Sequence, residues 1–128
     1  MGTTIAEFEL NSLPPTVNNL YGRLRRTVYK KPAVRKWQNE TVEYLSREWK
    51  KKAALTKELE LRIEFTSKDH RKWDIDNRIK PLQDCLERSG IIKNDRQIER
   101  LQVRRRYGDQ ERTHIILMEY SESEAEEG

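Results

Sequence analysis

Alternating apolar and polar residues predict the strands of this chain. The strictest alternation covers residues 59–65, where Leu, Leu, Ile and Phe fall on one face and charged residues on the other. A shorter alternating run at 5–10 is followed by a cluster of turn-forming residues. Two further extended stretches, 98–107 and 113–120, flank a short turn that begins at Gly108. We expect these two stretches to pair as a hairpin.

Helical spacing of apolar residues predicts two helices. Pro32 opens the first, from about Ala33 to Lys52, and the second begins just after position 76 and is ended by Gly90 as its C-terminal cap. Residues 16–31 show no such period and are expected to form an irregular loop. The predicted order is β-α-β-α-β-β, an α/β (α+β) chain in which two helices pack on a mixed β-sheet as a small two-layer domain.

Length and composition limit the organisation to one small domain. The 128 residues suffice for a single core, assigned here to residues 1–120, and the acidic segment 121–128 is expected to be a disordered tail. Only 34% of the residues are hydrophobic, whereas 38% are charged. So few apolar residues give a small core or one that a second chain completes, and we therefore expect a homodimer.

Charge narrows the class of partner. The net charge is +4, and the five glutamates from Glu119 onward contribute −5, so residues 1–118 carry +9. A body this basic favours a polyanion such as nucleic acid. Cys85 is the only cysteine, which excludes an internal disulfide and a multi-thiolate zinc site. No apolar run has the length of a membrane span, and we expect a cytoplasmic protein without a membrane partner.

Three aspartates form the most informative chemical pattern. Asp74 and Asp76 stand two apart among cationic residues, and Asp95 follows the second predicted helix. In extended backbone, residues i and i+2 face the same way, so Asp74 and Asp76 can converge on one ion while Ile75 points to the core. Carboxylates are hard oxygen ligands that suit Mg²⁺, and the surrounding cations would attract a phosphodiester.

The second helix would bring a lysine to the same place. If Asp76 or Asn77 caps that helix, Lys80 lies about one turn after Asp76, with its ammonium near the carboxylates. A purely structural interpretation stays open at this point. Asp-x-Asp arises by chance in a chain this charged, and helix capping alone explains Asp76.

The order of these residues resembles one known family. The motif Asp-x-Asp-Asn-x-x-Lys at 74–80, with Asp84 inside the helix, then Gly90 and Asp95, resembles the RusA family of Holliday junction resolvases. The segment Pro14–Tyr21 is similar to that family's early segment of two prolines, asparagine and tyrosine. Together these segments cover most of the chain.

The resemblance implies a fold, an activity and a site. It implies a RusA-like homodimer that resolves four-way DNA by paired symmetric nicks in recombination and repair, encoded by a bacterium, phage or prophage. It also implies that Asp74, Asp76 and Asp95 bind divalent metal, Mg²⁺ or Mn²⁺, and that Lys80 completes the catalytic set. Asn94 departs from the pattern, because the family often has a second acid there, and a differently tuned metal site is expected. Pro81, in the first turn of the helix, is a second departure.

Further basic and aromatic residues are candidates for DNA contact. We assign this role to polar residues of the 16–31 loop and to the two cations that precede the acids: Asn18, Tyr21, Arg23, Arg25, Arg26, Lys30, Lys31, Arg71 and Lys72. In the run Arg104–Arg106, strand alternation turns one side chain away from the other two, and phosphate contact and solvation fit equally well. His70 is interpreted as a solvated loop residue. Trp73 is interpreted as an anchor that can help fix the neighbouring acids.

Two other functions fit parts of the sequence. A restriction-like nuclease needs an acid followed by Glu-x-Lys on a strand, but the only match, Glu48-Trp49-Lys50, precedes the acids and falls on a predicted helix. A non-catalytic DNA-binding protein would use the acids only to cap a helix and balance the basic surface. Metal-dependent nicking of a synthetic junction distinguishes this alternative from a resolvase.

Overall fold

The computed structural model describes residues 3–16, 21–24, 27–50, 52–70, 73 and 75–122, with only the backbone of 21–24 and 27–30. Its elements, including two short 3-10 turns labelled η2 and η3, are β1 (Thr4–Leu10), β2 (Tyr21–Leu24), β3 (Thr27–Lys30), α1 (Pro32–Trp49), β4 (Leu59–Ser67), η2 (Ile75–Arg78), α2 (Ile79–Arg88), η3 (Asp95–Gln97), β5 (Ile98–Tyr107) and β6 (Arg112–Glu119). The predicted α+β class is confirmed. The tail predicted to be disordered covers 121–128, of which 123–128 lie outside the described residues.

The main sheet has four strands in the order β1-β6-β4-β5. β4 pairs parallel to β5 and antiparallel to β6, so the expected hairpin between residues 98–107 and 113–120 is wrong. The reason lies in the connections. α2 carries the chain from β4 to β5 as a crossover between parallel strands, and β6 then returns on the other side of β4. The strand with the strictest apolar alternation thereby takes a central position.

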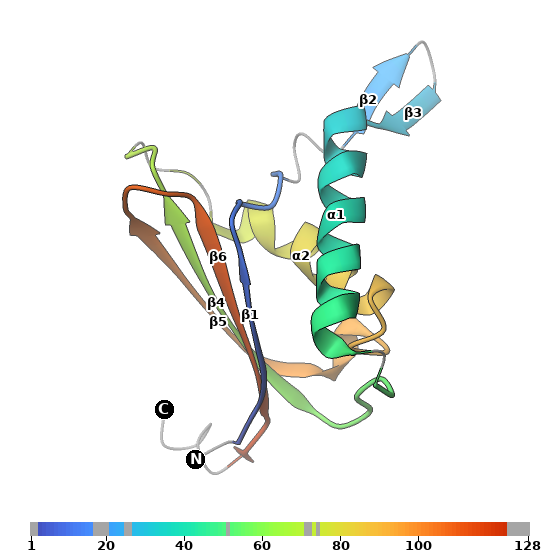
Figure 1. Cartoon of the computed structure of the whole chain (residues 1–128), viewed down its shortest axis with the longest axis vertical. Coiled ribbons are helices and arrows are strands. Elements are labelled where there is room, and N and C mark those ends of the chain that lie inside the picture. Colours follow the sequence, from blue (N-terminus) through green and yellow to red (C-terminus); the bar gives the residue numbers. More distant parts are fainter. Residues whose placement is uncertain are drawn as a thin grey trace.

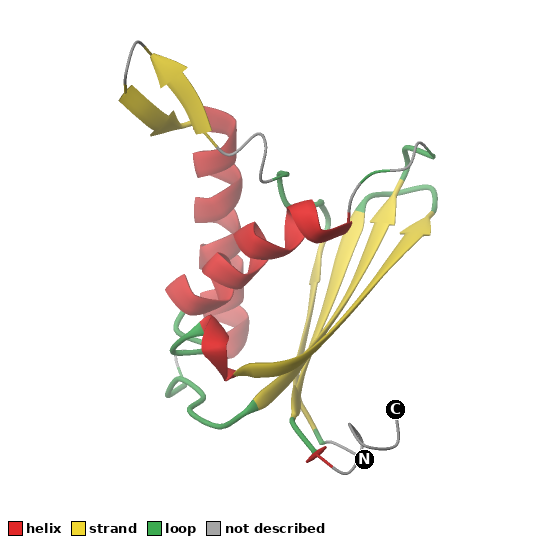
Figure 2. Cartoon of the chain, turned by 180° about the vertical axis from the view of Figure 1, so that it is seen from behind, coloured by secondary structure: helices red, strands yellow, loops and turns green. Residues whose placement is uncertain are grey.

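α1 and α2 cover one face of this sheet, and none of the described residues forms a helix on the opposite face (Figures 1 and 2). The covered face packs alternate residues of the central strands against the inner sides of α1 and α2. The most deeply buried members of this core are Leu45, Leu59, Leu61, Phe65, Leu82, Cys85, Leu86, Ile91, Ile115 and Leu117. Gly90, at φ 80°, follows the last turn of α2 and confirms the predicted cap. Within the described chain, no helix has the length and apolar character needed to cross a membrane.

The segment predicted as an irregular loop contains a small hairpin. β2 and β3 pair antiparallel, from Tyr21 opposite Lys30 to Leu24 opposite Thr27. The hairpin projects beyond the first turn of α1, away from the main sheet (Figure 1). The sequence signal was weak because each strand has only four residues and basic side chains interrupt the alternation. The structure therefore presents this basic segment on a defined backbone beside α1.

Candidate active site

Lys80 lies between two carboxylates at the start of α2. Its Nζ is 3.0 Å from Asp84 Oδ1 and 3.2 Å from Asp95 Oδ2. Lys80 and Asp84 are four residues apart on one helix and share a face, whereas Asp95 comes from η3. The exposed side-chain fractions are 55% for Lys80, 36% for Asp84 and 34% for Asp95. These three residues, called the Lys80 cluster below, are therefore accessible from solvent.

These carboxylates favour the charged form of the lysine. Hydrogen bonds to Asp84 and Asp95 raise the pKa of Lys80 above its ordinary value of 10.5, and slight burial opposes them more weakly. Lys80 is therefore a cation at neutral and mildly alkaline pH. A fixed positive charge at this place can pair with a phosphate oxygen as well as with a carboxylate.

Several hydrogen bonds hold Asp95 in place. The Asp95 backbone N–H donates to Glu87 Oε1 of α2 at 2.7 Å. Asn94 caps η3 by accepting from the Arg96 N–H at 2.8 Å, and Gln97 Oε1 accepts from the Asn94 N–H at 2.9 Å. The side chain that replaces the family's second acid thus has a structural role as a cap. Gln97 further ties this turn to the preceding loop by donating to the Leu55 carbonyl at 2.8 Å.

The predicted acid pair is only partly described. Asp74 lies outside the described residues, and Asp76 is an exposed residue of η2. The expected extended backbone at Asp76 is wrong, since Ile75–Arg78 forms a 3-10 turn, and so is the expected cap, because Arg78 is the N-cap residue of α2. Ile75 packs against the core as expected. Among the described residues, no three acidic, His or Cys side chains form a group that could hold a metal ion.

Trp73, just before the acids, packs against the core. Its ring contacts Phe65 edge-on, with centroids 5.8 Å apart. The Arg78 guanidinium lies 4.7 Å and that of Arg105 5.6 Å from its centroid. Arg105 Nη1 also donates to the Trp73 carbonyl. The predicted anchoring role of Trp73 is therefore confirmed as a packing arrangement.

The predicted DNA-contacting residues are described unevenly. Asn18, Arg25, Arg26, Arg71 and Lys72 lie outside the described residues, and only the backbone is described at Tyr21, Arg23 and Lys30. Lys31 is exposed at the N-terminal end of α1. The structure places Tyr21, Arg23 and Lys30 on the β2–β3 hairpin and Lys31 at its junction with α1. A role of the nine residues in DNA binding stays a prediction.

The arginine run on β5 divides between the two faces of the sheet. Arg104 and Arg106 lie on the face without helices, where each pairs with Glu64 at 3.8 and 3.3 Å. Arg105 points the other way, to Trp73. The predicted alternation is confirmed, and the middle arginine has a protein partner near the acids.

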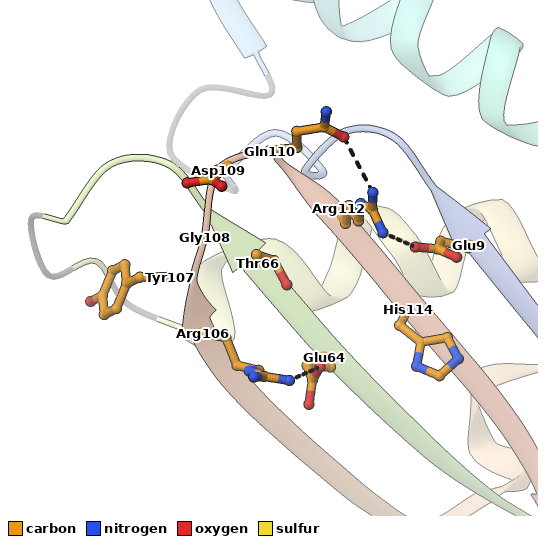
Figure 3. Close-up of a pocket in the computed structure, with 10 residues that line it drawn as sticks. All are labelled: Glu9, Glu64, Thr66, Arg106, Tyr107, Gly108, Asp109, Gln110, Arg112 and His114. Carbon is orange, nitrogen blue, oxygen red and sulfur yellow. Dashed lines mark hydrogen bonds and ion pairs between the residues drawn. The ribbon is translucent and has the colours of Figure 1, made fainter.

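A pocket of about 630 Å³ opens on the face without helices, at the β5–β6 turn. Within it, Arg106 pairs with Glu64, and Arg112 pairs with Glu9 and donates to the side chain of Gln110 (Figure 3). Tyr107 points away from these pairs, and its ring stacks on the His70 ring with centroids 5.3 Å apart. The pocket contains neither Lys80 nor the predicted metal ligands, so the chemistry of the site lies elsewhere.

Two contacts in this region were not predicted from the sequence. Asp84 pairs with Lys80, a contact that the i,i+4 spacing on a predicted helix could have revealed. Arg105 contacts Trp73 across 32 positions of sequence, and no local pattern signals such a pairing.

Comparison with known proteins adds an independent finding. The chain matches the family model described as endodeoxyribonuclease RusA over residues 12–118. It is also 38% identical over 90 residues to a protein of Aquifex aeolicus (strain VF5) named crossover junction endodeoxyribonuclease RusA. That match covers 70% of this chain and 71% of the relative. The matched family region includes the Lys80 cluster and the Trp73 contacts.

Proposed function

This chain belongs to the RusA family of endodeoxyribonucleases, and we propose that it cuts four-way DNA junctions at a divalent metal held by Asp74, Asp76 and Asp95. The family assignment makes the protein a Holliday junction-resolving endodeoxyribonuclease. The observation that carries the site assignment is the Lys80 cluster. A lysine between two part-exposed aspartates, one of them in the predicted ligand set, forms the cationic and acidic centre that phosphodiester hydrolysis needs.

The residues present fit a hard divalent cation. Asp84 and Asp95 direct carboxylate oxygens at one positively charged group, which indicates that this place favours a cation. Oxygen donors of this kind suit Mg²⁺ or Mn²⁺. When bound, such an ion would supply Lewis-acid polarisation of the phosphate and a more acidic water molecule.

Lys80 has two roles in this proposal. Its ammonium would hold a phosphate oxygen of the scissile bond and stabilise the charge that develops there. Asp84 would keep that ammonium at the site, because the i,i+4 pair on α2 does not depend on Asp95. The hydrogen bond from the Asp95 backbone to Glu87 would keep Asp95 directed at the same place.

The two-fold symmetry of a four-way junction supports a homodimer with matching symmetry. Two identical sites on a homodimer would meet the two symmetry-related strands of a four-way junction and nick both. The low apolar content of the chain also supports a core or surface that a second copy completes. The basic β2–β3 hairpin and Lys31 would follow the phosphate backbone.

Strand-specific cleavage of a synthetic junction tests this function. We expect paired nicks at symmetric positions of a labelled four-way junction in Mg²⁺, no cutting in EDTA, and little cutting of linear duplex of the same sequence. Tight junction binding without cutting in Mg²⁺ or Mn²⁺ would instead support the non-catalytic alternative.

A further inference from the structure

The contacts of Arg105 differ from those of its neighbours on β5. Arg104 and Arg106 pair with the carboxylate of Glu64 on the face without helices. The Arg105 guanidinium instead donates to the backbone carbonyl of Trp73. It also lies over two aromatic rings, 5.6 Å from the Trp73 centroid and 5.8 Å from that of Tyr107. A backbone hydrogen bond combined with ring stacking fixes a chain segment more closely than an exposed ion pair does.

Trp73 is held from the other sides as well. Its ring meets Phe65, which is fully buried, and the guanidinium of Arg78. Arg78 in turn donates to the Pro14 carbonyl, and burial lowers the pKa of Arg78 below its ordinary value without removing its charge. Trp73 is therefore fixed by the core, by η2 and by β5 together.

This fixed residue is adjacent to the predicted metal ligands. In the sequence, Trp73 immediately precedes Asp74. Ile75, which packs against the core, immediately follows Asp74. Trp73 and Ile75 are thus both held against the core, directly before the proposed ligand Asp76. Metal ligands must be positioned within about 0.5 Å, and residues that orient them typically account for about 10- to 100-fold in metal affinity.

The geometry points to Arg105 as a positioning residue of the proposed metal site: through the Trp73 carbonyl and ring, it holds the residue from which the chain leads into η2 and its proposed ligand Asp76. The inference rests on the proposed function. It assigns Arg105 no direct contact with DNA or metal. Lysine cannot replace it, because an ammonium lacks the planar fork that donates to the carbonyl and stacks on the rings at the same time.

Two substitutions and one matched control test this role. Arg105→Gln removes the charge, Arg105→Lys keeps it, and Arg104→Gln makes the same charge change on the opposite face of the same strand. Mn²⁺ binding to the DNA-free protein is measured by calorimetry. Junction binding, junction cleavage as a function of Mg²⁺ and thermal unfolding in EDTA are measured beside it. We expect both Arg105 variants to bind Mn²⁺ at least ~10-fold more weakly and to regain much of their cleavage rate at high Mg²⁺. Arg104→Gln should match the wild type in Mn²⁺ binding and in cleavage.

Each other outcome contradicts this role. If Arg105→Lys binds Mn²⁺ like the wild type, the fork is unnecessary and the inference is wrong, even where Arg105→Gln fails to fold. Unchanged Mn²⁺ binding with weaker junction binding would make Arg105 a DNA contact. An equal loss of metal affinity in Arg104→Gln would indicate a general charge effect. A wild-type protein that neither binds Mn²⁺ nor cuts in its presence would contradict the proposed function itself.

Discussion

At the level of single residues, only part of the Lys80 cluster could be predicted from the sequence. The resemblance indicated Lys80 and Asp95, and the structure brings their charged atoms to 3.2 Å. Asp84 was recognisable only as part of the motif, although its spacing from Lys80 already allowed an ion pair on α2. The contact between Arg105 and Trp73 could not be predicted, because it depends on which strand lies beside the acidic segment.

The charge of Lys80 gives a residue-scale prediction. Because Asp84 is the largest cause of its raised pKa, Asp84→Asn should lower the pKa of Lys80 toward 10.5. A raised lysine pKa gives stabilisation that is complete below the ordinary value and is lost as pH rises through the raised value. Stability near neutral pH should therefore show no dependence on this titration. An NMR titration of the Lys80 side chain in metal-free protein measures the shift, with Glu40→Gln as the control that should leave it unchanged.

Substitution of Lys80 itself separates catalysis from attraction. Lys80→Ala should lower the single-turnover cleavage rate by ~10²-fold or more, since it removes a charge from the reacting phosphate. A lysine that only attracts DNA would mainly weaken binding and flatten its salt dependence by about one unit of slope. A single-turnover rate close to wild type at saturating enzyme, with weaker binding, would assign Lys80 to the second class.

At the level of secondary-structure elements, local sequence patterns predicted which helices and strands form but not which strands pair. The alternation at residues 59–65 and the apolar spacing of both helices correspond to β4, α1 and α2. The turn after Gly108 suggested a hairpin, yet β4 lies between β5 and β6. Pairing depends on the crossover through α2 and on burial of β4 between its two neighbours, and neither is a local property. The 3-10 turn at Asp76 was missed for a similar reason, since core packing of Ile75 and Trp73 shapes that segment.

The end of α2 provides a stability prediction. Gly90 has φ 80°, and an added Cβ would meet no atom within 4 Å, so Gly90→Ala should be strained by backbone conformation alone. The expected loss is about 1 kcal/mol of unfolding free energy in urea titrations. Gly90→Asn should lose less, because asparagine tolerates this conformation better. Equal stability of the alanine variant and the wild type would contradict the role of Gly90 as a cap.

For the whole molecule, we expect two copies of this small chain to act together on a two-fold symmetric four-way junction. We expect sedimentation at micromolar concentration to give twice the mass of the 15.4 kDa chain. The physical reason is the low apolar content of the chain, which gives a small core that a second copy would complete. A monomer that still makes paired nicks at full rate would contradict the homodimer.

The central claim is that the acidic cluster around Lys80 performs metal-dependent junction cleavage. The most direct measurement is single-turnover cutting of a four-way junction in Mg²⁺ by Asp95→Asn beside Asp109→Asn, an acid of the β5–β6 turn at the pocket in Figure 3. Asp95→Asn should bind the junction but not cut it, because its carboxylate charge is lost, while Asp109→Asn should cut like the wild type. Substantial Mg²⁺-dependent cutting by Asp95→Asn would contradict the assignment of this cluster as the active site.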